Sequence, residues 1–378
     1  MKICITSASG IEAVTKKELK KLIGVEELAA INGRIVFEGG WREVVKCNLL
    51  LRTASRVEIV LGEFRAENFD DLYEGVSSVE WENYIPRDGN ILISVKCVQS
   101  KIYAHTATQS ITKKAICERL KKVFGVNELS EDGERYKVEI AILKDFVTVT
   151  LDTSGDGLHR RGYRGLVGEA PLKETLASAM IQLSVWNSLR PFADLFCGTG
   201  TIPIEACLIA KNVPSGINRE FDFEKWNLRY KSIIESLKEK ARAEIDYEKE
   251  VKISGFDIDE KQLSLARKHA KIAGVDKYIH FQRADVADFS SSKEYGVIIS
   301  NPPYGERLSD RKEIEKIYRL YGKAFSSLKN WSAYTLTPVT DFERLFGKRA
   351  DKKRKLYNGK IECTYYSMLG NPPPKKKS

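Results

Sequence analysis

The sequence predicts an α/β protein whose C-terminal half forms a doubly wound, mainly parallel sheet, preceded by two smaller α/β units. Apolar segments of strand length alternate with segments of helical spacing along the chain, as is typical of sheets with crossover helices. In the C-terminal half, acidic or amide residues stand directly after successive apolar strands. The 378 residues are enough for two or three domains, each with its own core.

Composition excludes several classes of protein. No apolar run approaches the length of a membrane span, and the N-terminus continues directly into a strand pattern rather than a signal peptide. Seven scattered cysteines without a C-x-x-C pair, and four dispersed histidines, indicate a cytoplasmic protein with free thiols and no metal site. The net charge of +10 suits a polyanionic partner, but solubility alone explains it equally well.

The first part of the chain, residues 1–64, is expected to form a small α+β unit. Apolar residues alternate in its strand segments and recur every three or four positions in its helix segments. A tight turn at Asn32-Gly33 indicates a β-hairpin over 28–37. The other expected elements are strands over 2–7 and 57–64 and helices over 10–22 and 41–51.

Residues 65–155 repeat the alternation and form the second expected unit. Its helix over 107–124 carries basic side chains, among them Lys113 and Lys114. Such a face suits contact with an RNA backbone, although the sequence alone favours a solvated helix surface. The other expected elements are a helix over 69–79 and strands over 91–98, 137–143 and 146–151.

Residues 156–169 are rich in glycine, arginine and aromatic residues and are expected to be a linker or extended arm. Arg160, Arg161 and Arg164 stand close to Tyr163. Arginine suits bidentate phosphate contacts and stacking on bases. This composition favours contact with a nucleic acid or with a neighbouring domain over a simple solvated connector.

Residues 170–378 carry the doubly wound pattern. A polar insertion over 211–250 contains a charged helix over 230–244, and a basic turn is expected over 348–355. The expected strands of the sheet cover 251–257, 279–281, 296–300, 332–338 and 361–369, and the helices cover 171–189, 202–210, 261–273 and 314–328.

A glycine-rich loop after the first buried strand of this region, residues 194–201, is the first candidate for a binding site. Its glycines allow positive φ and close approach of a ligand to the backbone at a helix N-terminus. Pro203 stands where a dinucleotide fingerprint has its third glycine, and no phosphate-binding G-x-x-x-x-G-K loop is present. A carboxylate beside glycines better suits a ligand with a cationic amino-acid end. By itself, however, this loop is a weak signal.

Asp257, Asp285 and Asn301 strengthen this signal, because each stands at or near the end of a further expected strand of the sheet. In an open α/β sheet, ligands bind beyond the carboxyl ends of the strands. Asp257 is placed to accept hydrogen bonds from ribose hydroxyls, and Asp285 is placed to bind an exocyclic amine. Phe256 and Ile258 are placed to flank an adenine ring. Each acid alone is better explained as a helix N-cap or a surface carboxylate, but the ordered set predicts a nucleoside-containing cofactor.

The fourth strand end carries Asn301-Pro302-Pro303-Tyr304. Consecutive prolines hold a loop rigid and leave backbone carbonyls exposed. The Asn301 amide oxygen and the Pro302 carbonyl can then converge on one amino group and stabilise the charge that it gains on attack. Tyr304 offers a ring on which an extruded base stacks.

The segments 194–202 (DLFCGTGTI) and 300–308 (SNPPYGERL) together resemble those of amino-methyltransferases that use S-adenosylmethionine. The whole chain is similar to the subfamily with an N-terminal ferredoxin-like unit, a THUMP RNA-binding domain and a C-terminal Rossmann-like class I methyltransferase domain. Segments 159–164 (HRRGYR) and 170–177 (APLKETLA) match it too. Members methylate the N2 amine of guanine in RNA.

The resemblance implies roles for individual residues. Asn301, Pro302 and Tyr304 would hold the target base, and basic residues of the helix and arm (Lys113, Lys114, Arg160, Arg161 and Arg164) would contact RNA. The cofactor would be held by Lys173, Thr175, Asp194, Phe196, Cys197, Gly198, Thr199, Gly200, Thr201, Asp257, Ile258, Asp285, Val286 and Asn301. The arm and C-terminal region most resemble the branch that acts on 23S ribosomal RNA.

Other functions stay open at this point. A tRNA guanine-N2 methyltransferase shares the same domain plan, and an assembly factor that only binds RNA would retain the same fold. The N-P-P-Y motif also occurs in adenine-specific DNA methylases, although the RNA-binding N-terminal half argues against DNA. A covalent cytosine-C5 mechanism is disfavoured because Cys197 does not stand in a Pro-Cys nucleophile motif.

Overall fold

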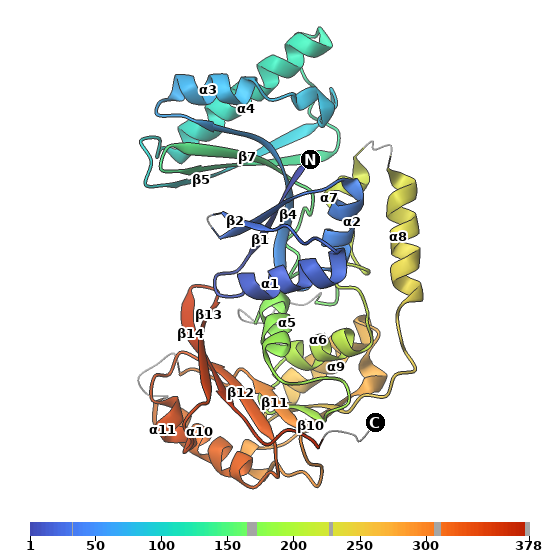
Figure 1. Ribbon diagram of the computed structural model, residues 1–378, viewed down its shortest axis with the longest axis vertical. Coiled ribbons are helices and arrows are strands. Elements are labelled where there is room, and N and C mark those ends of the chain that lie inside the picture. The colour runs from blue at the N-terminus through green and yellow to red at the C-terminus, as the bar shows by residue number, and fades with distance from the viewer. Residues whose placement is uncertain (32, 165–171, 227–229, 306–310, 375–378) are drawn as a thin grey trace.

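The computed structural model describes residues 1–31, 33–164, 172–226, 230–305 and 311–374. Its secondary structure divides into two seven-stranded sheets, one in each half of the chain (Figure 1). Within the described residues, no helix combines the length and apolarity needed to cross a lipid bilayer.

The N-terminal half is built on one continuous sheet with the strand order β2-β3-β1-β4-β7-β6-β5. Strand β4 (Ala54–Arg65) crosses the boundary expected at residues 64 and 65, because it pairs with β1 on one side and with β7 on the other. The two small units therefore share a sheet rather than meeting at a linker. The remaining elements are β1 (Lys2–Ser7), β2 (Ala29–Ile31), β3 (Arg34–Glu38), β5 (Asn90–Val98), β6 (Arg135–Leu143), β7 (Phe146–Asp152), α1 (Glu12–Glu18), the π-helical turn Leu19–Ile23, α2 (Trp41–Leu50), α3 (Phe69–Ser77), the 3₁₀ turn Trp81–Asn83 and α4 (His105–Phe124).

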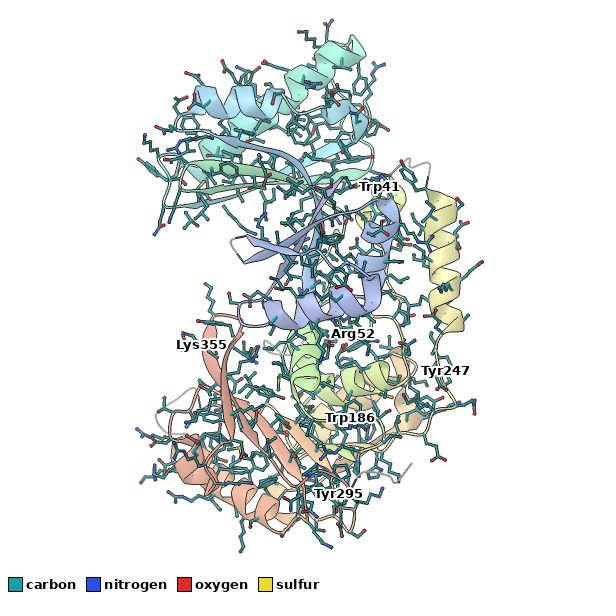
Figure 2. The ribbon with its side chains drawn as sticks, in the orientation of Figure 1. Trp41, Arg52, Trp186, Tyr247, Tyr295 and Lys355 are labelled. Atoms are coloured by element: carbon teal, nitrogen blue, oxygen red, sulfur yellow. The ribbon has the colours of Figure 1, made fainter. Side chains whose placement is uncertain are left out.

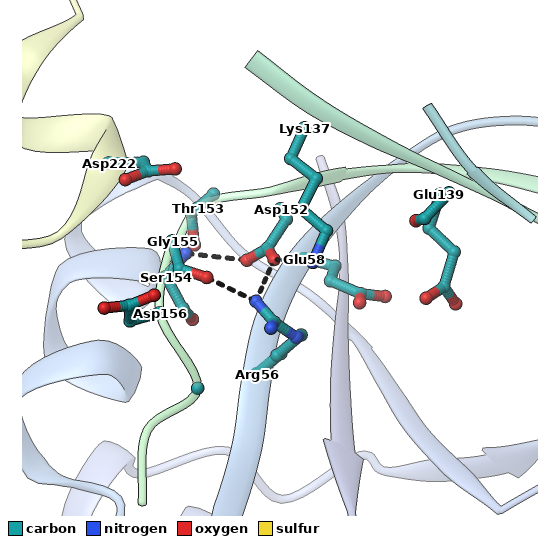
Figure 3. Close-up of polar contacts among 12 residues, drawn as sticks. Arg56, Glu58, Lys137, Glu139, Asp152, Thr153, Ser154, Gly155, Asp156 and Asp222 are labelled. Atoms are coloured by element: carbon teal, nitrogen blue, oxygen red, sulfur yellow. Dashed lines mark hydrogen bonds and ion pairs between the residues drawn. The ribbon is translucent and has the colours of Figure 1, made fainter. Parts of the chain in front are cut away.

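Charged side chains bind the two units together across this sheet. Arg56 of β4 pairs with Asp152 of β7 and donates to the carbonyl of Gly155 at 2.5 Å (Figure 3). Arg34 of β3 pairs with Glu139 of β6 at 2.5 Å. These carboxylates are almost fully buried, and each has a second cationic partner, Lys137 beside Asp152 and Lys96 beside Glu139. Their buried charges are therefore compensated from both units.

The C-terminal half is a mixed sheet with the order β10-β9-β8-β11-β12-β14-β13. The first five strands in this order are parallel, and β14 and β13 are antiparallel additions at one edge. The elements are β8 (Phe192–Asp194), β9 (Ile253–Asp257), β10 (Ile279–Arg283), β11 (Val297–Ser300), β12 (Ser332–Thr337), β13 (Lys352–Asn358), β14 (Ile361–Met368), α5 (Glu174–Leu183), α6 (Thr201–Ala210), α7 (Asp222–Lys225), α8 (Lys231–Ala243), α9 (Glu260–Ile272), α10 (Arg311–Ser326), α11 (Phe342–Phe346) and the 3₁₀ turns Asp276–Tyr278 and Val286–Asp288.

Two expectations about these elements are wrong. The helix predicted over 171–189 is the shorter α5, which ends at Leu183 because Ser184 adopts an extended conformation; Pro171 lies outside the described residues. The basic stretch over 348–355 is not a turn alone, because β13 begins at Lys352 and pairs with β14. Its four basic residues did not show the alternation of apolar and polar side chains that identifies a strand.

The insertion over 211–250 joins the two halves. Its apolar residues Phe221, Phe223 and Trp226 are buried in the core of the N-terminal half. The Trp226 ring stacks on Tyr136 of β6 at 4.8 Å, and its indole N–H donates to the carbonyl of Arg135 at 3.0 Å. Helix α8 packs beside α2 of the N-terminal half (Figure 1), and its residues Ile234 and Leu237 belong to the same core. The insertion therefore fixes the N-terminal half to the C-terminal half.

A buried polar cluster completes this junction. Arg52, which lies between the two halves in Figure 2, donates to the carbonyl of Val213 at 2.5 Å. Arg161 donates to the carbonyls of Arg52 and Leu158, and Glu205 of α6 lies 3.6 Å from its Nε. All these groups are buried. The position of α6, which begins at the glycine loop, is thus fixed partly by the N-terminal half.

Candidate functional site

Four neighbouring strands bring the residues selected from the sequence to one edge of the C-terminal sheet. Strand β8 ends at Asp194, and β9 ends at Asp257. Asn301 directly follows β11, and Asp285 follows β10 by two positions. Since the order is β10-β9-β8-β11 and these strands are parallel, the four side chains meet at the carboxyl edge, where ligands bind in this architecture.

The glycine loop after β8 is held by hydrogen bonds and by close packing. The Gly198 N–H donates to Asp257 Oδ2 at 2.8 Å. Gly200 has φ of +84°, and a Cβ on it would lie 2.9 Å from the Cβ of Ala266 in α9, so only glycine fits. His269 Nδ1 lies 3.1 Å from the carbonyl oxygen of Thr199. The loop therefore has a fixed shape without a ligand.

Asp194 is the most strongly perturbed acid of this edge. Its Oδ1 accepts from the backbone N–H of Phe196 at 3.1 Å, whereas its buried Oδ2 has no hydrogen-bond partner among the described residues. Burial raises the pKa of this carboxyl to about 7, and hydrogen bonds only partly oppose the rise. An ammonium group placed here would restore the charged carboxylate and satisfy the free oxygen.

The rest of the loop is mostly buried. The Phe196 ring contacts Tyr321 edge-on at 5.4 Å. Burial raises the pKa of the Cys197 thiol well above its usual value, which makes this cysteine a packing residue rather than a nucleophile. Thr201 begins α6, and its hydroxyl accepts a hydrogen bond from Arg164.

Asp257 and Asp285 line the neighbouring strand ends. Asp257 accepts from Gly198 and, through Oδ1, from the N–H of Asp259 at 2.9 Å. Asp285 caps a short 3₁₀ turn by accepting from the N–H of Ala287 at 2.9 Å. A carboxylate has about four acceptor positions, so both acids retain capacity for a ligand. Beside them, Ile258 is exposed and Val286 is buried.

Helix α5 contributes the other two residues expected at the cofactor. Lys173 is its N-cap and is exposed, whereas Thr175 lies in its first turn and is buried. Glu174, between them, lies 3.4 Å from the Nε of Arg164. Arg164 therefore links the start of α5 to the start of α6.

The second loop, Asn301 to Tyr304, is held differently. The Tyr304 hydroxyl donates to Asn301 Oδ1. The same hydroxyl accepts from Asn358 Nδ2 at 3.3 Å, and Cys363 Sγ lies 3.8 Å away. Both partners belong to the β13–β14 hairpin. The amide oxygen proposed to bind a target amine is thus already engaged by a neighbouring side chain.

The carbonyl of Pro303, one residue after Pro302, also accepts a hydrogen bond. Tyr318 of α10 donates from its hydroxyl to the carbonyl of Pro303 at 3.1 Å, and this hydroxyl lies 2.8 Å from Thr337 Oγ1. Pro302 is buried and Pro303 is exposed. The loop is therefore anchored at its base by α10 and β12.

The residues expected to contact RNA fall into two groups, those exposed to solvent and those already bonded within the protein. Lys114 and Arg160 are exposed. Lys113 is less so, since its ammonium donates to the carbonyl of Ile91 at 2.7 Å and pairs with Glu131. Arg161 and Arg164 are engaged within the protein as described above, and Arg161 is almost fully buried. This placement does not fit RNA contact by Arg161 or Arg164. Arg161 connects the two halves, whereas Arg164 links α5 to α6 within the C-terminal half.

Sequence reasoning missed three residues of the site. His269, Tyr318 and Asn358 each hold one of the two loops. The first two lie on the buried faces of helices. The available signal was a side chain with a polar end at a position that the helical spacing assigns to the apolar face. Asn358 gave no signal, because it lies between the turn expected over 348–355 and the strand expected over 361–369.

The side chains and the glycine loop at this edge of the sheet fit S-adenosylmethionine. An unpartnered buried carboxylate oxygen at Asp194 suits the cationic amino-acid end of this cofactor, and the loop at Gly200 is packed too closely for any side chain. Asp257 stands one strand further along, where a ribose would follow. Within the described part of the chain, no group of three or more His, Cys, Asp or Glu side chains is arranged to hold a metal ion.

Three family models match successive parts of the chain. Residues 2–58 match the RlmL ferredoxin-like domain, residues 66–152 match the THUMP domain, and residues 161–367 match the RMKL-like methyltransferase domain.

Whole-chain comparisons agree with these matches. The "Putative RNA methyltransferase YpsC" of Bacillus subtilis is 42% identical over 98% of this chain and 97% of its own length. A "Ribosomal RNA large subunit methyltransferase K/L" of Syntrophotalea carbinolica is 33% identical over 96% of this chain, which spans only 53% of that relative. The crystal structure of SMU.472, "a putative methyltransferase complexed with SAH", superposes with a TM-score of 0.94 at 42% identity, covering 99% of both chains.

Proposed function

Because the chain belongs to the RMKL-like methyltransferase family with ferredoxin-like and THUMP domains, we propose that it methylates the exocyclic N2 amine of a guanosine in large-subunit (23S) ribosomal RNA, with S-adenosylmethionine as donor. One observation carries the proposal. Asp194, whose Oδ2 has no hydrogen-bond partner among the described residues, and the Asn301-to-Tyr304 loop follow adjacent strands, β8 and β11. A donor and an acceptor amine bound to them would lie next to each other.

The residues of the first loop would bind and orient the donor. Asp194 would pair with the methionine ammonium, Asp257 with the ribose hydroxyls and Asp285 with the adenine amine. Bound S-adenosylmethionine supplies an electrophilic methyl group on a sulfonium. Because the glycine loop is already fixed by Gly198 and Gly200, little ordering is needed on binding.

The residues of the second loop would present the acceptor. Asn301 Oδ1 and the Pro302 carbonyl would accept from the guanine amine, and Tyr304 would stack on the base. As the nitrogen–carbon bond forms and the sulfur–carbon bond breaks, these acceptors stabilise the positive charge on nitrogen. The amine proton then passes to water, and S-adenosylhomocysteine remains. Alignment of the two partners supplies much of the acceleration, on the order of 7–11 kcal/mol.

The RNA partner is supported by the match to the THUMP domain and by the relatives, which are named as RNA and ribosomal RNA methyltransferases. Lys114 and Arg160 are the exposed candidates for phosphate contacts. An rRNA substrate would place the reaction in the cytoplasm.

Nucleoside mass spectrometry tests the proposal. Ribosomal and transfer RNA would be purified separately from cells that lack the gene and from the same cells with the gene restored. We expect N2-methylguanosine to decrease in large-subunit rRNA and to return on complementation. A decrease confined to tRNA would contradict the rRNA substrate, and unchanged N2-methylguanosine in both pools would contradict the activity.

A further inference from the structure

Strand β13 carries four consecutive exposed basic residues, Lys352 to Lys355. This strand forms the edge of the C-terminal sheet, and its hairpin with β14 projects toward the N-terminal half (Figure 1). The turn of the hairpin lies at the acceptor loop, because Asn358 donates to the Tyr304 hydroxyl. A continuous basic edge therefore leads to the place where a target base would be presented.

The two faces of β13 differ in how their charges are used. Successive side chains of a strand point to opposite faces. On one face, Lys353 pairs with Glu343 and Lys355 pairs with Glu362. The opposite face carries Lys352 and Arg354, which form no ion pair among the described residues. Arg354 donates one long hydrogen bond to the carbonyl of Gly10 at 3.4 Å.

The face with Lys352 and Arg354 is the one that points toward the acceptor loop. Leu356 and Asn358 share it by alternation. Leu356 is buried in the same apolar cluster as Ile11, and Asn358 touches Tyr304. At about 3.3 Å per residue, Arg354 lies only ~13 Å along the strand from Asn358. We call Lys352 and Arg354 together the hairpin face.

The basic residues of β13 also have a simpler explanation, which is protection of an edge strand. Lysines on an exposed edge often serve to prevent pairing with another chain. Here the loop before α1 covers this edge at Lys355, since a Cβ on Gly10 would lie 2.7 Å from the carbonyl oxygen of Lys355. This cover reduces the need for charge to prevent edge pairing, and the unpaired cations of the hairpin face call for another role.

We infer that the hairpin face binds phosphates of the RNA strand that flanks the target nucleotide. The inference rests on the proposed RNA substrate and assigns it a second contact surface, separate from the THUMP domain. Arginine and lysine bind phosphate by charge-assisted hydrogen bonds and release counterions from RNA. An RNA strand bound to the hairpin face would pass the acceptor loop, where one of its nucleotides would turn toward Asn301.

A salt titration of RNA binding tests this surface. The test variant is K352Q/R354Q, and the matched control is K353Q/K355Q, which removes the same charge from the opposite face of the same strand. The probe is large-subunit rRNA extracted from cells that lack the gene, with filter binding measured over a series of KCl concentrations. Calorimetry with S-adenosylmethionine checks that both variants retain a native cofactor site.

For K352Q/R354Q, we expect affinity for the rRNA to fall at least 10-fold at low salt. The slope of log affinity against log salt should become shallower by about 1.4, as for two lost contacts to a single strand. The control should stay within about two-fold of wild type. An unchanged slope in K352Q/R354Q, or an equal loss in the control, would overturn the inference.

Methyl transfer separates this inference from the proposed function. If wild-type protein binds the rRNA with the predicted contribution from the hairpin face but transfers no methyl group to guanine N2, the proposed reaction is wrong and the surface stands. If wild-type protein methylates guanine N2 and K352Q/R354Q shows unchanged KM and kcat for the rRNA, the surface is wrong and the reaction stands.

Discussion

The two loops at the carboxyl edge of the C-terminal sheet are prepared for their ligands in opposite ways. The glycine loop is fixed by its own domain and leaves one buried acceptor, Asp194 Oδ2, without a partner. The acceptor loop has its central oxygen, Asn301 Oδ1, already bonded to Tyr304. The protein is thus ready to receive a cation at the first loop, whereas a base entering the second must displace an internal hydrogen bond. This difference predicts that cofactor binding precedes and is independent of acceptor binding.

The largest effect is expected from Asn301→Ala. This substitution removes the acceptor that would stabilise the charged amine, and loss of one such group costs about 10²–10³-fold in kcat. The measurement is transfer of radiolabelled methyl groups to unmodified rRNA under single-turnover conditions. Transfer at the wild-type rate would remove Asn301 from the mechanism.

Asp194→Ala should weaken cofactor binding and leave the fold intact. The lost charge-assisted hydrogen bond is worth about 1.5–3 kcal/mol, or roughly 10- to 150-fold in the dissociation constant. Removal of the buried Oδ2, which has no partner among the described residues, and loss of the hydrogen bond from the Phe196 N–H to Oδ1 act in opposite directions, so the melting temperature of the ligand-free protein should change little. Calorimetry and thermal unfolding measure the two quantities; wild-type affinity would show that the ammonium is bound elsewhere.

Gly200→Ala tests whether the first loop is prebuilt. A methyl group there meets Ala266 and forces a left-handed φ on alanine, at a cost of about 1–3 kcal/mol. Gly198→Ala is the matched control, since its φ is also positive, at +49°, but no atom lies within 4 Å of the added Cβ. We expect a larger loss of stability and of cofactor affinity at residue 200. Equal effects would mean that packing against α9 does not shape the loop.

Cofactor binding should depend on pH near neutrality. Burial raises the pKa of Asp194 to about 7, and the cationic ligand binds the ionised form. Affinity for S-adenosylmethionine should therefore be highest above pH 7 and fall by up to 10-fold for each pH unit below it. The Asp194→Asn variant should lack this pH dependence. A wild-type affinity that is constant between pH 6 and 8 would contradict the assignment.

The smallest effect is expected from Tyr304→Phe. The ring remains available for stacking, and the hydroxyl that occupies Asn301 is removed, so kcat should change by no more than about three-fold. Tyr304→Ala should reduce turnover much further, because stacking on a base is worth about 1–3 kcal/mol. Single-turnover rates of the two variants measure the difference. If Phe is as damaging as Ala, the hydroxyl and not the ring is the functional group.

Much of the architecture could be predicted because it depends on local patterns. The strands that end at Asp194, Asp257 and Ser300 are short, apolar and followed by polar residues, and these features survive in any tertiary context. Their order in the sheet then places the motif residues together. The basic strand β13 escaped detection because its exposed edge gives no alternation of apolar and polar residues.

Contacts between distant segments could not be predicted from the sequence. Arg161 belongs to an arginine-rich arm that suits RNA equally well, and only the three-dimensional structure shows its burial against Glu205 and Arg52. The 211–250 insertion looked polar, yet Phe221 and Trp226 complete the core of the other half. The role of these residues depends on which distant segments pack against each other, and the local spacing of apolar and polar residues does not contain this information.

The division of work between the loops is tested most directly by calorimetric titration of S-adenosylmethionine into Asn301→Ala. The account predicts a dissociation constant within about two-fold of wild type, because Asp194, Gly198 and Asp257 are untouched and hold the donor without help from the acceptor loop. Loss of affinity as large as that of Asp194→Ala would contradict it, since the two loops would then form a single cofactor site.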